Sequence, residues 1–435
     1  MIRLELGEIA RLAPGRLDAA GDVAAVDGVS IDSRTVEPGD LFVAVGRGAE
    51  FVDEARARGA AATLVPDDAF AAFAALGRAV RDRSSARVVA ITGSVGKTTT
   101  KDILGALCAA HVPTVVAEGS RNNEIGLPLT LCRIEPETEI VVVEMGMRGI
   151  GQIAELCAIA RPQIGVVTSV GPVHLELLGT VERVAQTKAE VVTTLPPGGT
   201  AVVPADEPLL VPYLRDDVRT IGFGPGGEVR LVSFEATADG AQLTVDVEEE
   251  RVELEFAFGA RHAAANALAA LGAYWALGLP LERAYVGARA ARLSPWRGEE
   301  APLPGDGLLI NDAYNANPIS MAAALEHLVD RAGPRRRVAV LGDMAELGPD
   351  APAYHREVGT AAERAGVSVL VAVGELARGY LAGAPAIGET RWAANAESGL
   401  AVLREVLEPG DCVLVKGSRS VGLEAVAEAL AVVAA

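Results

Sequence analysis

The chain has 435 residues, half of them hydrophobic, and carries a formal net charge of −19. Its length predicts about three domains, each able to bury a core. The acidic balance argues against nucleic acid as a partner, because such binding needs a basic face. Residues 1–20 lack an apolar segment with a basic start, and no stretch reaches the ~18 uncharged apolar residues of a membrane span. We therefore expect a cytoplasmic protein without membrane insertion.

The first predicted domain covers residues 1–85. A short strand, a Pro-Gly turn and a second apolar strand follow one another in GVSIDSRTVEPGDLFVAV. The helical pattern EARARGAA and the strand ATLV complete a small α/β unit, and the polar run RDRSSAR ends it.

The second predicted domain covers residues 86–295. Apolar strands alternate with helical patterns in the order RVVAIT, EIVVVEM and QIGVVTSV. This alternation predicts a mostly parallel, doubly wound sheet of the P-loop ATPase type. The later segment AQLTVDVEEERVELEFAF alternates apolar and polar residues, which predicts antiparallel hairpins at one side of that sheet.

The third predicted domain covers residues 296–435. It follows the Pro- and Gly-rich segment RLSPWRGEEAPLPGDG, which is typical of a linker. Four short strands come next, with helical patterns between them: GLLIND, RRVAVLG, SVLVAVG and DCVLVKG. This order predicts a second, Rossmann-like α/β domain.

The run RVVAITGSVGKTTT predicts a phosphate-binding loop between a strand and a helix. Gly93 and Gly96 would let backbone amides approach phosphate, Lys97 would neutralise the β and γ phosphates, and the Thr98 hydroxyl would hold Mg²⁺. The loop is shorter than the usual pattern, which has glycine where Ile91 stands. A glycine turn before a capped helix is the alternative, but the Gly-Lys-Thr-Thr sequence favours ATP.

Three further residues are candidates on weaker grounds. Glu144 ends a strand, where a carboxylate suits Mg²⁺, although a plain surface acid fits equally well. A lone histidine such as His174 is more often structural than a ligand. Lys188, in VERVAQTKAE, has the setting of a solvated helix lysine. Spacing alone assigns neither His174 nor Lys188 to a site.

Along its whole length the chain resembles the Mur ligases, which are ATP-dependent amide-forming enzymes of peptidoglycan precursor synthesis. The shared segments follow the order of that family: TGSVGKTT, VEMGM, VGPVHLELLG, AQTKAE and GARHAAANALAA. Other segments resemble the branch that adds D-alanyl-D-alanine to UDP-N-acetylmuramoyl-tripeptide: SIDSRTVEPGDLFVAV, RNNEIGLPLT, NDAYNANPISM, LGDMAELG and VLVKGSRSVGLE. The resemblance implies the three-domain α/β architecture of the family, with a central ATP-binding sheet and a C-terminal Rossmann-like domain.

The resemblance also implies roles for individual residues. The catalytic group would be Lys97, Glu144, His174 and Lys188. Thr98 and Glu144 would bind one Mg²⁺, and His174 with a carbamylated Lys188 would bind a second. ATP would contact Gly93, Ser94, Val95, Gly96, Lys97, Thr98, Thr99, Asn266, Arg297, Asp312 and Tyr314. The UDP-linked substrate and the dipeptide would contact Ser33, Arg34, Asn122, Asn123, Asn315 and Asn317.

Taken without the resemblance, several of these residues have simpler explanations. Asn266 fits a helix cap, Asp312 and Asn315 fit an Asx turn, and Ser33 fits a strand-end hydroxyl. The implied partners are the two small-molecule substrates, without nucleic acid, and the implied state is a monomer. No motif identifies the third residue of the tripeptide, diaminopimelate or lysine.

The activity implied is that of an ATP-dependent acid–amino-acid ligase that works through an acyl phosphate. Two alternatives stay open at this point. One is a superfamily relative that adds a different amino acid, or glutamate to folate, rather than a dipeptide. The other is a P-loop regulatory ATPase, which would turn over ATP without any dependence on an amine acceptor.

Overall fold

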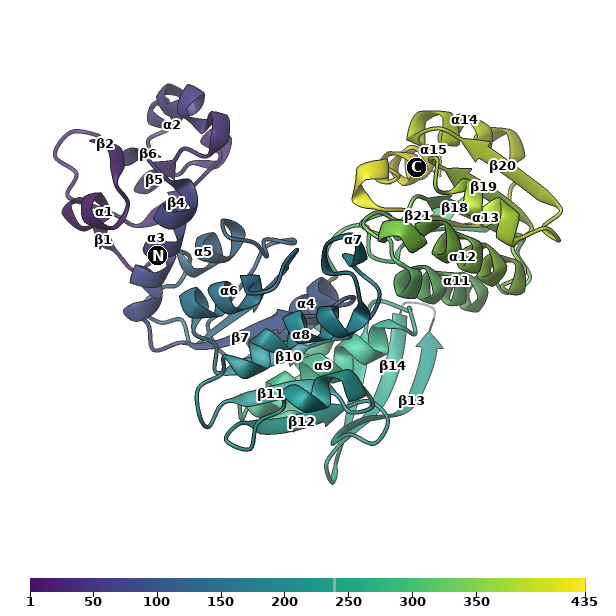
Figure 1. The fold of residues 1–435 in the computed structure, drawn as a ribbon, viewed down its shortest axis with the longest axis horizontal. Coiled ribbons are helices and arrows are strands. Elements are labelled where there is room, and N and C mark those ends of the chain that lie inside the picture. Colours follow the sequence, from purple (N-terminus) through teal and green to yellow (C-terminus); the bar gives the residue numbers. More distant parts are fainter. Residues whose placement is uncertain (238–239, 435) are drawn as a thin grey trace.

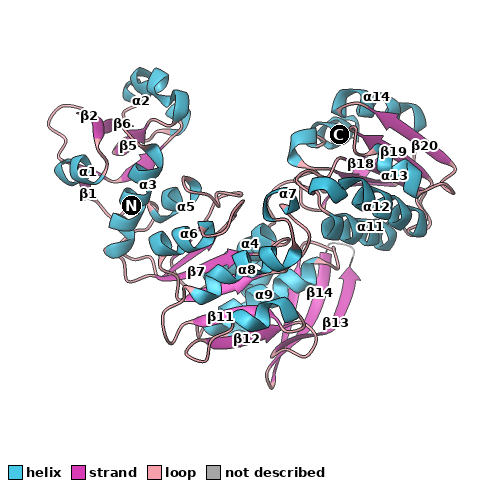
Figure 2. Cartoon of the chain, viewed as in Figure 1, coloured by secondary structure: helices cyan, strands magenta, loops and turns pink. Residues whose placement is uncertain are grey.

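The computed structural model describes residues 1–237 and 240–434. The chain forms three α/β domains, and the N-terminal and C-terminal domains stand at opposite ends of the central one (Figure 1). Each domain has a sheet flanked by helices (Figure 2). The α/β architecture predicted from the sequence is confirmed. None of the helices within the described residues combines the length and apolar character needed to span a lipid bilayer.

The N-terminal domain is built on a small mixed sheet in the order β2-β6-β5-β4, beside a β1–β3 ladder. Leu41 and Leu64 of this sheet pack with Phe73 and Leu76 of α3, and the same apolar cluster continues beneath the central sheet. Helix α3 therefore joins the two domains. The elements are β1 (Leu4–Glu5), α1 (Leu6–Leu12), β2 (Gly15–Ala19), β3 (Ala25–Val26), β4 (Gly28–Ser30), η1 (Ser33–Thr35), β5 (Asp40–Val43), η2 (Gly46–Phe51), α2 (Val52–Ala57), β6 (Ala62–Pro66) and α3 (Ala69–Asp82).

The central sheet has the order β15-β14-β13-β12-β11-β10-β7-β9-β8. Its strands are parallel from β8 to β13, and β13, β14 and β15 form the predicted antiparallel hairpins. The parallel strands read as continuous apolar runs because both faces are buried. The strands are β7 (Arg87–Thr92), β8 (Thr114–Val116), β9 (Ile140–Glu144), β10 (Ile164–Val167), β11 (Thr200–Pro204), β12 (Arg219–Phe223), β13 (Val229–Thr237), β14 (Gly240–Val247) and β15 (Glu250–Phe256).

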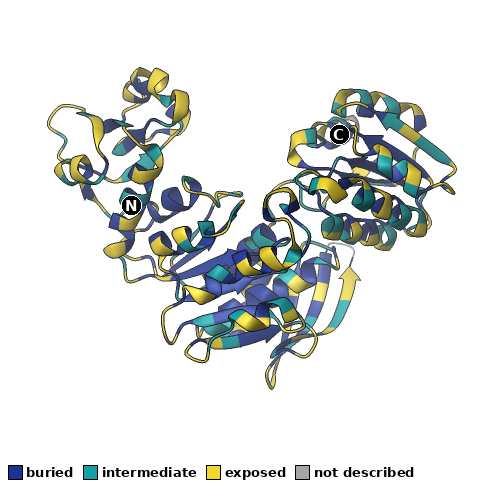
Figure 3. Cartoon of the chain, in the orientation of Figure 1, coloured by how far each residue is buried: buried dark blue, intermediate teal, exposed yellow. Residues whose placement is uncertain are grey.

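Helices cover both faces of this sheet. Its strands β9 and β10 are buried, whereas β13 carries exposed residues (Figure 3). One face packs against α4, α9 and α10, and the other against α3, α5, α6 and α8. The helical segments are α4 (Lys97–Ala109), α5 (Gly126–Leu131), α6 (Gln152–Ala160), α7 (Leu175–Leu178), α8 (Val181–Thr193), η3 (Pro208–Tyr213), α9 (Ala263–Ala276), η4 (Leu281–Arg283) and α10 (Ala284–Ala290).

The C-terminal sheet has the order β16-β17-β21-β18-β19-β20. The four strands predicted from the sequence are β17, β21, β18 and β19. They are parallel, and β16 adds an antiparallel edge. The strands are β16 (Glu299–Leu303), β17 (Gly307–Asn311), β18 (Arg337–Gly342), β19 (Val369–Val373), β20 (Glu389–Ala393) and β21 (Cys412–Lys416). The helical segments are α11 (Pro318–Ala332), η5 (Gly348–Asp350), α12 (Ala351–Arg364), α13 (Arg378–Gly383), α14 (Ala396–Val406), η6 (Arg419–Val421) and α15 (Glu424–Ala434).

The linker interpretation of the Pro- and Gly-rich segment was wrong over Glu299–Leu303, which is strand β16. Pro302 is tolerated there because β16 is an edge strand with one partner. The other edge strand, β20, was also missed, because its sequence ETRWA is polar and only partly buried. Edge strands have weaker apolar signals than central strands, so the pattern in the sequence did not reveal them.

A buried histidine in the C-terminal domain gives a pH-dependent prediction. His355 is fully buried, and burial lowers its pKa below the ordinary value of 6.5. As the pH falls, His355 therefore takes up a proton in the unfolded chain before it does so in the folded chain. The free energy of unfolding falls as pH drops below about 6.5. We expect His355→Gln to be less stable than the wild type at pH 7.5 but to lose less stability between pH 7 and pH 5. Urea unfolding at a series of pH values measures this slope, and equal slopes would contradict the prediction.

Candidate active site

The phosphate-binding loop lies between β7 and α4, as predicted. Gly96 has φ +86°, and a Cβ there would lie 2.0 Å from Oδ1 of Asn266, so only glycine fits. Two residues after β10 brace the loop. The backbone N–H of Val95 donates to Oγ of Ser169 (2.9 Å), and the Thr168 hydroxyl donates to the Val95 carbonyl. The loop therefore has a fixed shape at the amino terminus of α4, where amides and helix dipole favour an anion.

Thr98, at the start of α4, meets the carboxylate that ends β9. Its hydroxyl donates to Oε2 of Glu144 (2.8 Å), and Nδ2 of Asn122 donates to Oε1 of Glu144 (2.7 Å). Thr98 and Glu144 are buried. A hydroxyl and a carboxylate side by side provide oxygen ligands that suit Mg²⁺. Water and phosphate oxygens would complete the coordination of such an ion. No cluster of three or more His, Cys, Asp or Glu side chains in the described part of the chain could hold a metal alone.

Lys97 lies against the same loop. Its Nζ donates to the Gly93 carbonyl (2.7 Å). Burial lowers its pKa, with a further lowering from Arg297 that the charge of Glu144 opposes. Lys97 is partly exposed in the cavity, and phosphate oxygens bound in the loop would supply negative charge next to its ammonium.

His174 and Lys188 line the same cavity as the phosphate-binding loop. Lys188, on α8, is almost fully buried, and its pKa lies well below the ordinary value because of burial and the charge of Lys97. Burial also lowers the pKa of His174, and the charge of Lys188 adds to this shift. A lysine in this setting favours the neutral amine, which is the form that reacts with CO₂ to give a carbamate. The prediction of a solvated helix lysine was therefore wrong.

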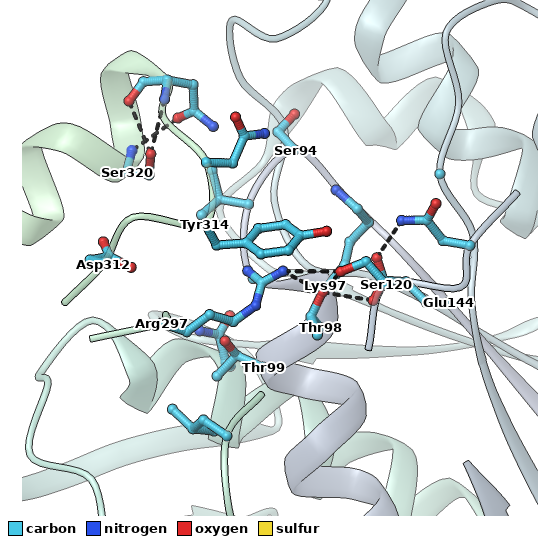
Figure 4. A pocket seen from close by; sticks show the side chains of 18 of the residues that line it. Ser94, Lys97, Thr98, Thr99, Ser120, Glu144, Arg297, Asp312, Tyr314 and Ser320 are labelled. Carbon is cyan, nitrogen blue, oxygen red and sulfur yellow. Dashed lines mark hydrogen bonds between the residues drawn. The ribbon is translucent and has the colours of Figure 1, made fainter. Parts of the chain in front are cut away.

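Residues of the C-terminal domain complete the cavity (Figure 4). Arg297 donates to the Thr98 hydroxyl (2.8 Å), and its guanidinium lies 4.1 Å from the centre of the Tyr314 ring. Ser120 lies 3.4 Å from both Thr98 and Arg297 and was not predicted. These contacts place a charged group of the interdomain segment directly at the phosphate loop.

Lys416, at the end of β21, is a second residue that the sequence did not reveal. Its buried Nζ donates to Oδ2 of Asp312 (2.6 Å) and to the Asn315 carbonyl (2.9 Å). It therefore fixes the loop that follows β17. In that loop, Oδ1 of Asn317 caps α11 by accepting from the Ser320 amide (2.9 Å), so this oxygen has a structural role.

The resulting cavity has a volume of about 590 Å³ and lies between the central and C-terminal domains. It collects most of the residues predicted for ATP, metal and dipeptide. Those that line it are Ser94, Val95, Gly96, Lys97, Thr98, Thr99, Asn122, Asn123, Glu144, His174, Lys188, Asn266, Arg297, Asp312, Tyr314, Asn315 and Asn317. Gly93 lies next to it at the start of the loop.

Ser33 and Arg34 do not line this cavity. They lie on η1 in the N-terminal domain, where the Ser33 hydroxyl donates to Glu54 (3.1 Å) and Arg34 pairs with Asp32 (2.7 Å). This pairing lowers the pKa of Asp32 to about 2. The structure thus separates the residues predicted for UDP from those predicted for ATP.

All four lysines of the sequence belong to this site or its support. Lys97, Lys188 and Lys416 line the cavity. Lys101 is buried, and its Nζ donates to the Gly119 carbonyl (2.7 Å), in the segment that leads to Ser120. Outside the site, the permanently charged basic side chains are therefore all arginines.

We predict that Lys416→Met lowers the free energy of unfolding by about 2 kcal/mol, because it leaves the largely buried carboxylate of Asp312 without its cation. Adding Asp312→Asn should recover more than half of this loss. Denaturant unfolding of the wild type, both single variants and the double variant gives the coupling between the two residues. Additive losses would show that the pair does not act as a unit.

Comparison with known proteins agrees with this geometry. The family model of the Mur ligase middle domain matches residues 91–274, and that of the Mur ligase, glutamate ligase domain matches residues 297–419. The chain is 33% identical over 452 residues to the UDP-N-acetylmuramoyl-tripeptide–D-alanyl-D-alanine ligase of Escherichia coli (strain K12), with 99% of both chains covered.

Two solved structures are also similar. MurF from Acinetobacter baumannii has a TM-score of 0.86 at 27% identity, with 99% of each chain covered. MurF ligase from Thermotoga maritima in complex with ADP has a TM-score of 0.79 at 28% identity, covering 93% of this chain and 97% of that chain. With two family models over its central and C-terminal domains and full-length similarity to a ligase, this chain belongs to the Mur ligase family.

Proposed function

We propose that the chain is an ATP-dependent ligase that joins D-alanyl-D-alanine to UDP-N-acetylmuramoyl-tripeptide, giving the pentapeptide, ADP and phosphate. The observation that carries this proposal is the hydrogen bond from Arg297 to Thr98. It joins the C-terminal domain to the phosphate loop, so that both domains line one cavity. The full-length similarity to relatives of that named activity supports the choice of substrates. The reaction belongs in the cytoplasm, where ATP and UDP-linked precursors are available.

The reaction must first activate a carboxylate, because its oxygen is a poor leaving group. Transfer of the γ-phosphoryl group of ATP to the tripeptide carboxylate gives an acyl phosphate and ADP. The amine of D-alanyl-D-alanine then attacks the acyl carbon, loses a proton, and expels phosphate. No covalent bond to the protein is required, so the residues act by position and charge.

The charged side chains of the cavity match this chemistry. Lys97 and Arg297 offset the negative charge that builds up between the acceptor carboxylate and the γ-phosphate. Mg²⁺ held by Thr98 and Glu144, and a second ion held by His174 and a carbamylated Lys188, would add positive charge at the same oxygens when bound.

The two ends of the cavity suit the other substrates. Asn122 and Asn123 lie on the central-domain side, next to Glu144, where the acyl phosphate would form. Asn315 comes from the C-terminal domain and would receive the dipeptide, whereas Tyr314 would contact ATP. Ser33 and Arg34, in the N-terminal domain, would hold the distant UDP group of a long substrate.

The test is to measure ADP release with the UDP-linked tripeptide and a series of amine acceptors. We expect release only when D-alanyl-D-alanine is present, and a product of pentapeptide mass. D-Alanine alone, other single amino acids and glutamate with folate serve as competing acceptors. Preference for a single amino acid would favour another amide ligase, whereas release independent of any acceptor would favour a regulatory ATPase and overturn the proposal.

A further inference from the structure

A carboxylate of the C-terminal domain contacts two separate loops of the central domain. Glu346 lies in the turn between β18 and η5. Its Oε2 lies 2.5 Å from Nδ1 of His174, and its Oε1 accepts from Arg148 at 3.1 Å. Its backbone carbonyl also accepts from the Glu176 amide at 3.3 Å. No part of the catalytic scheme described above uses this residue.

The turn that carries Glu346 is fixed by its own domain. The backbone N–H of Met344 donates to Nε2 of His355 (3.0 Å), and that of Ala345 donates to Oγ of Ser418 (2.9 Å). Both acceptors are buried. The carboxylate therefore has a defined position relative to the C-terminal sheet, and it meets the central domain only where the two domains are docked.

Both ends of the contact have unusual backbone. The φ angle is +53° at His174 and +62° at Glu346, in the left-handed region that non-glycine residues rarely occupy. Each such residue costs on the order of 1 kcal/mol and persists only where the surroundings hold it. Strain at both partners of one hydrogen bond points to a contact that function requires.

The contact determines which nitrogen of His174 carries the proton. A carboxylate oxygen only accepts, so Nδ1 must donate to Glu346 and the neutral ring has its proton there. Nε2 is then an unprotonated acceptor, on a side chain that lines the cavity. A carboxylate behind a histidine commonly fixes the tautomer and orientation of a ligand in this way.

We propose that Glu346 is a positioning residue, which sets the tautomer and orientation of His174 when the C-terminal domain docks on the central domain. Arg148 supports it by pairing with the second carboxylate oxygen. Docking of the domain would thereby complete the site at His174 as well as at Arg297. The effect of Glu346 on catalysis rests on the proposed function, whereas its effect on the tautomer does not.

The structural part is tested by NMR on protein labelled with ¹⁵N-histidine at pH 8, where neutral imidazole dominates. The sequence has five histidines, and His174→Gln assigns the resonance. In the wild type we expect the proton of the neutral His174 ring on Nδ1, with Nε2 unprotonated. In Glu346→Ala we expect this ring proton to be shared between Nδ1 and Nε2. Glu346→Gly also removes the carboxylate, and glycine adopts the positive φ at this position without strain. His355 is the internal control, because it bonds to the same turn and must keep its tautomer.

Kinetics test the consequence for the reaction. We expect Glu346→Ala to lower kcat about 10- to 100-fold, with the KM for ATP changed less than about threefold because Glu346 does not contact the phosphate loop. Glu346→Gln retains a side-chain oxygen that can accept from Nδ1 and should restore part of kcat. The matched control is Glu176→Gln, which removes the same charge from an exposed side chain at the same interface and should behave as the wild type.

The outcomes separate the two proposals. An unchanged His174 tautomer in Glu346→Ala and Glu346→Gly, with His355 also unchanged, would overturn the role of Glu346. A changed tautomer with unchanged kcat would overturn its part in the reaction. A changed tautomer in a protein without ligase activity would support the positioning of His174 while refuting the proposed function.

Discussion

Lys97→Met should lower kcat for ADP release by about a thousandfold, equivalent to about 4 kcal/mol of transition-state stabilisation. Lys97 lies against the phosphate loop, where its charge would stabilise the γ-phosphoryl group during transfer. The backbone amides that would hold the ground-state phosphates are unchanged in this variant. We therefore expect the affinity for ADP, measured by calorimetry, to fall by less than about tenfold.

Stability provides the control for this variant. Burial lowers the pKa of Lys97, so its charge is costly in the nucleotide-free protein. Lys97→Met should therefore melt at the same temperature as the wild type or higher when nucleotide is absent. Lys97→Arg keeps the charge but not the shape and should have intermediate activity. A lower melting temperature for Lys97→Met would mean that the lost activity reflects the fold.

Lys188→Ala should lower kcat by about a hundredfold or more, because it removes the residue that a carbamate would turn into an oxygen ligand. Carbamylation joins the neutral amine of Lys188 to the carbon of CO₂ and releases one proton. Burial holds the pKa of Lys188 well below its ordinary value and so favours that amine. Wild-type protein equilibrated with ¹³C-bicarbonate should show a carbamate resonance that Lys188→Ala lacks.

A small acid provides the second arm of this experiment. The cavity left by Lys188→Ala should admit formate or acetate, which would restore part of the activity by supplying carboxylate oxygens. Lys188→Gln fills the space and should not respond to either acid. Two results together would show that the carbamate is wrong. Wild-type protein freed of CO₂ would keep its full activity, and wild-type protein equilibrated with ¹³C-bicarbonate would give no carbamate resonance.

The parts of the site that the sequence predicted are local in the chain. Gly96, Lys97 and Thr98 lie in one strand–loop–helix unit, whose chemistry can be read from consecutive residues. Glu144 was a candidate by the rule that parallel strands end on the same edge of a sheet, with a surface acid as an equal alternative. The structure bears out this rule with the Thr98–Glu144 hydrogen bond. The local pattern was therefore sufficient to place the phosphate loop, and sheet topology brought Glu144 to it.

The parts that the sequence did not predict depend on packing between distant segments. Lys416 ends an apolar strand in the segment VLVKGSRSVGLE, to which the resemblance assigned no role, and its role emerges from its contact with Asp312. Ser120 and Glu346 likewise gain their roles where loops of different elements meet. His174 and Lys188 were assigned through the family resemblance, because the local sequence alone favoured a structural histidine and a solvated lysine.

The placement of the lysines has a consequence for chemical labelling. Lys101, Lys188 and Lys416 are buried, and Lys97 is partly exposed in the cavity. The described surface therefore offers arginine guanidinium groups rather than lysine amines to a reagent. Of the four lysine amines, an acylating reagent would reach that of Lys97, which lies in the cavity. Mass spectrometry of the acylated protein, with and without nucleotide, would then report the occupancy of the active site without a designed probe.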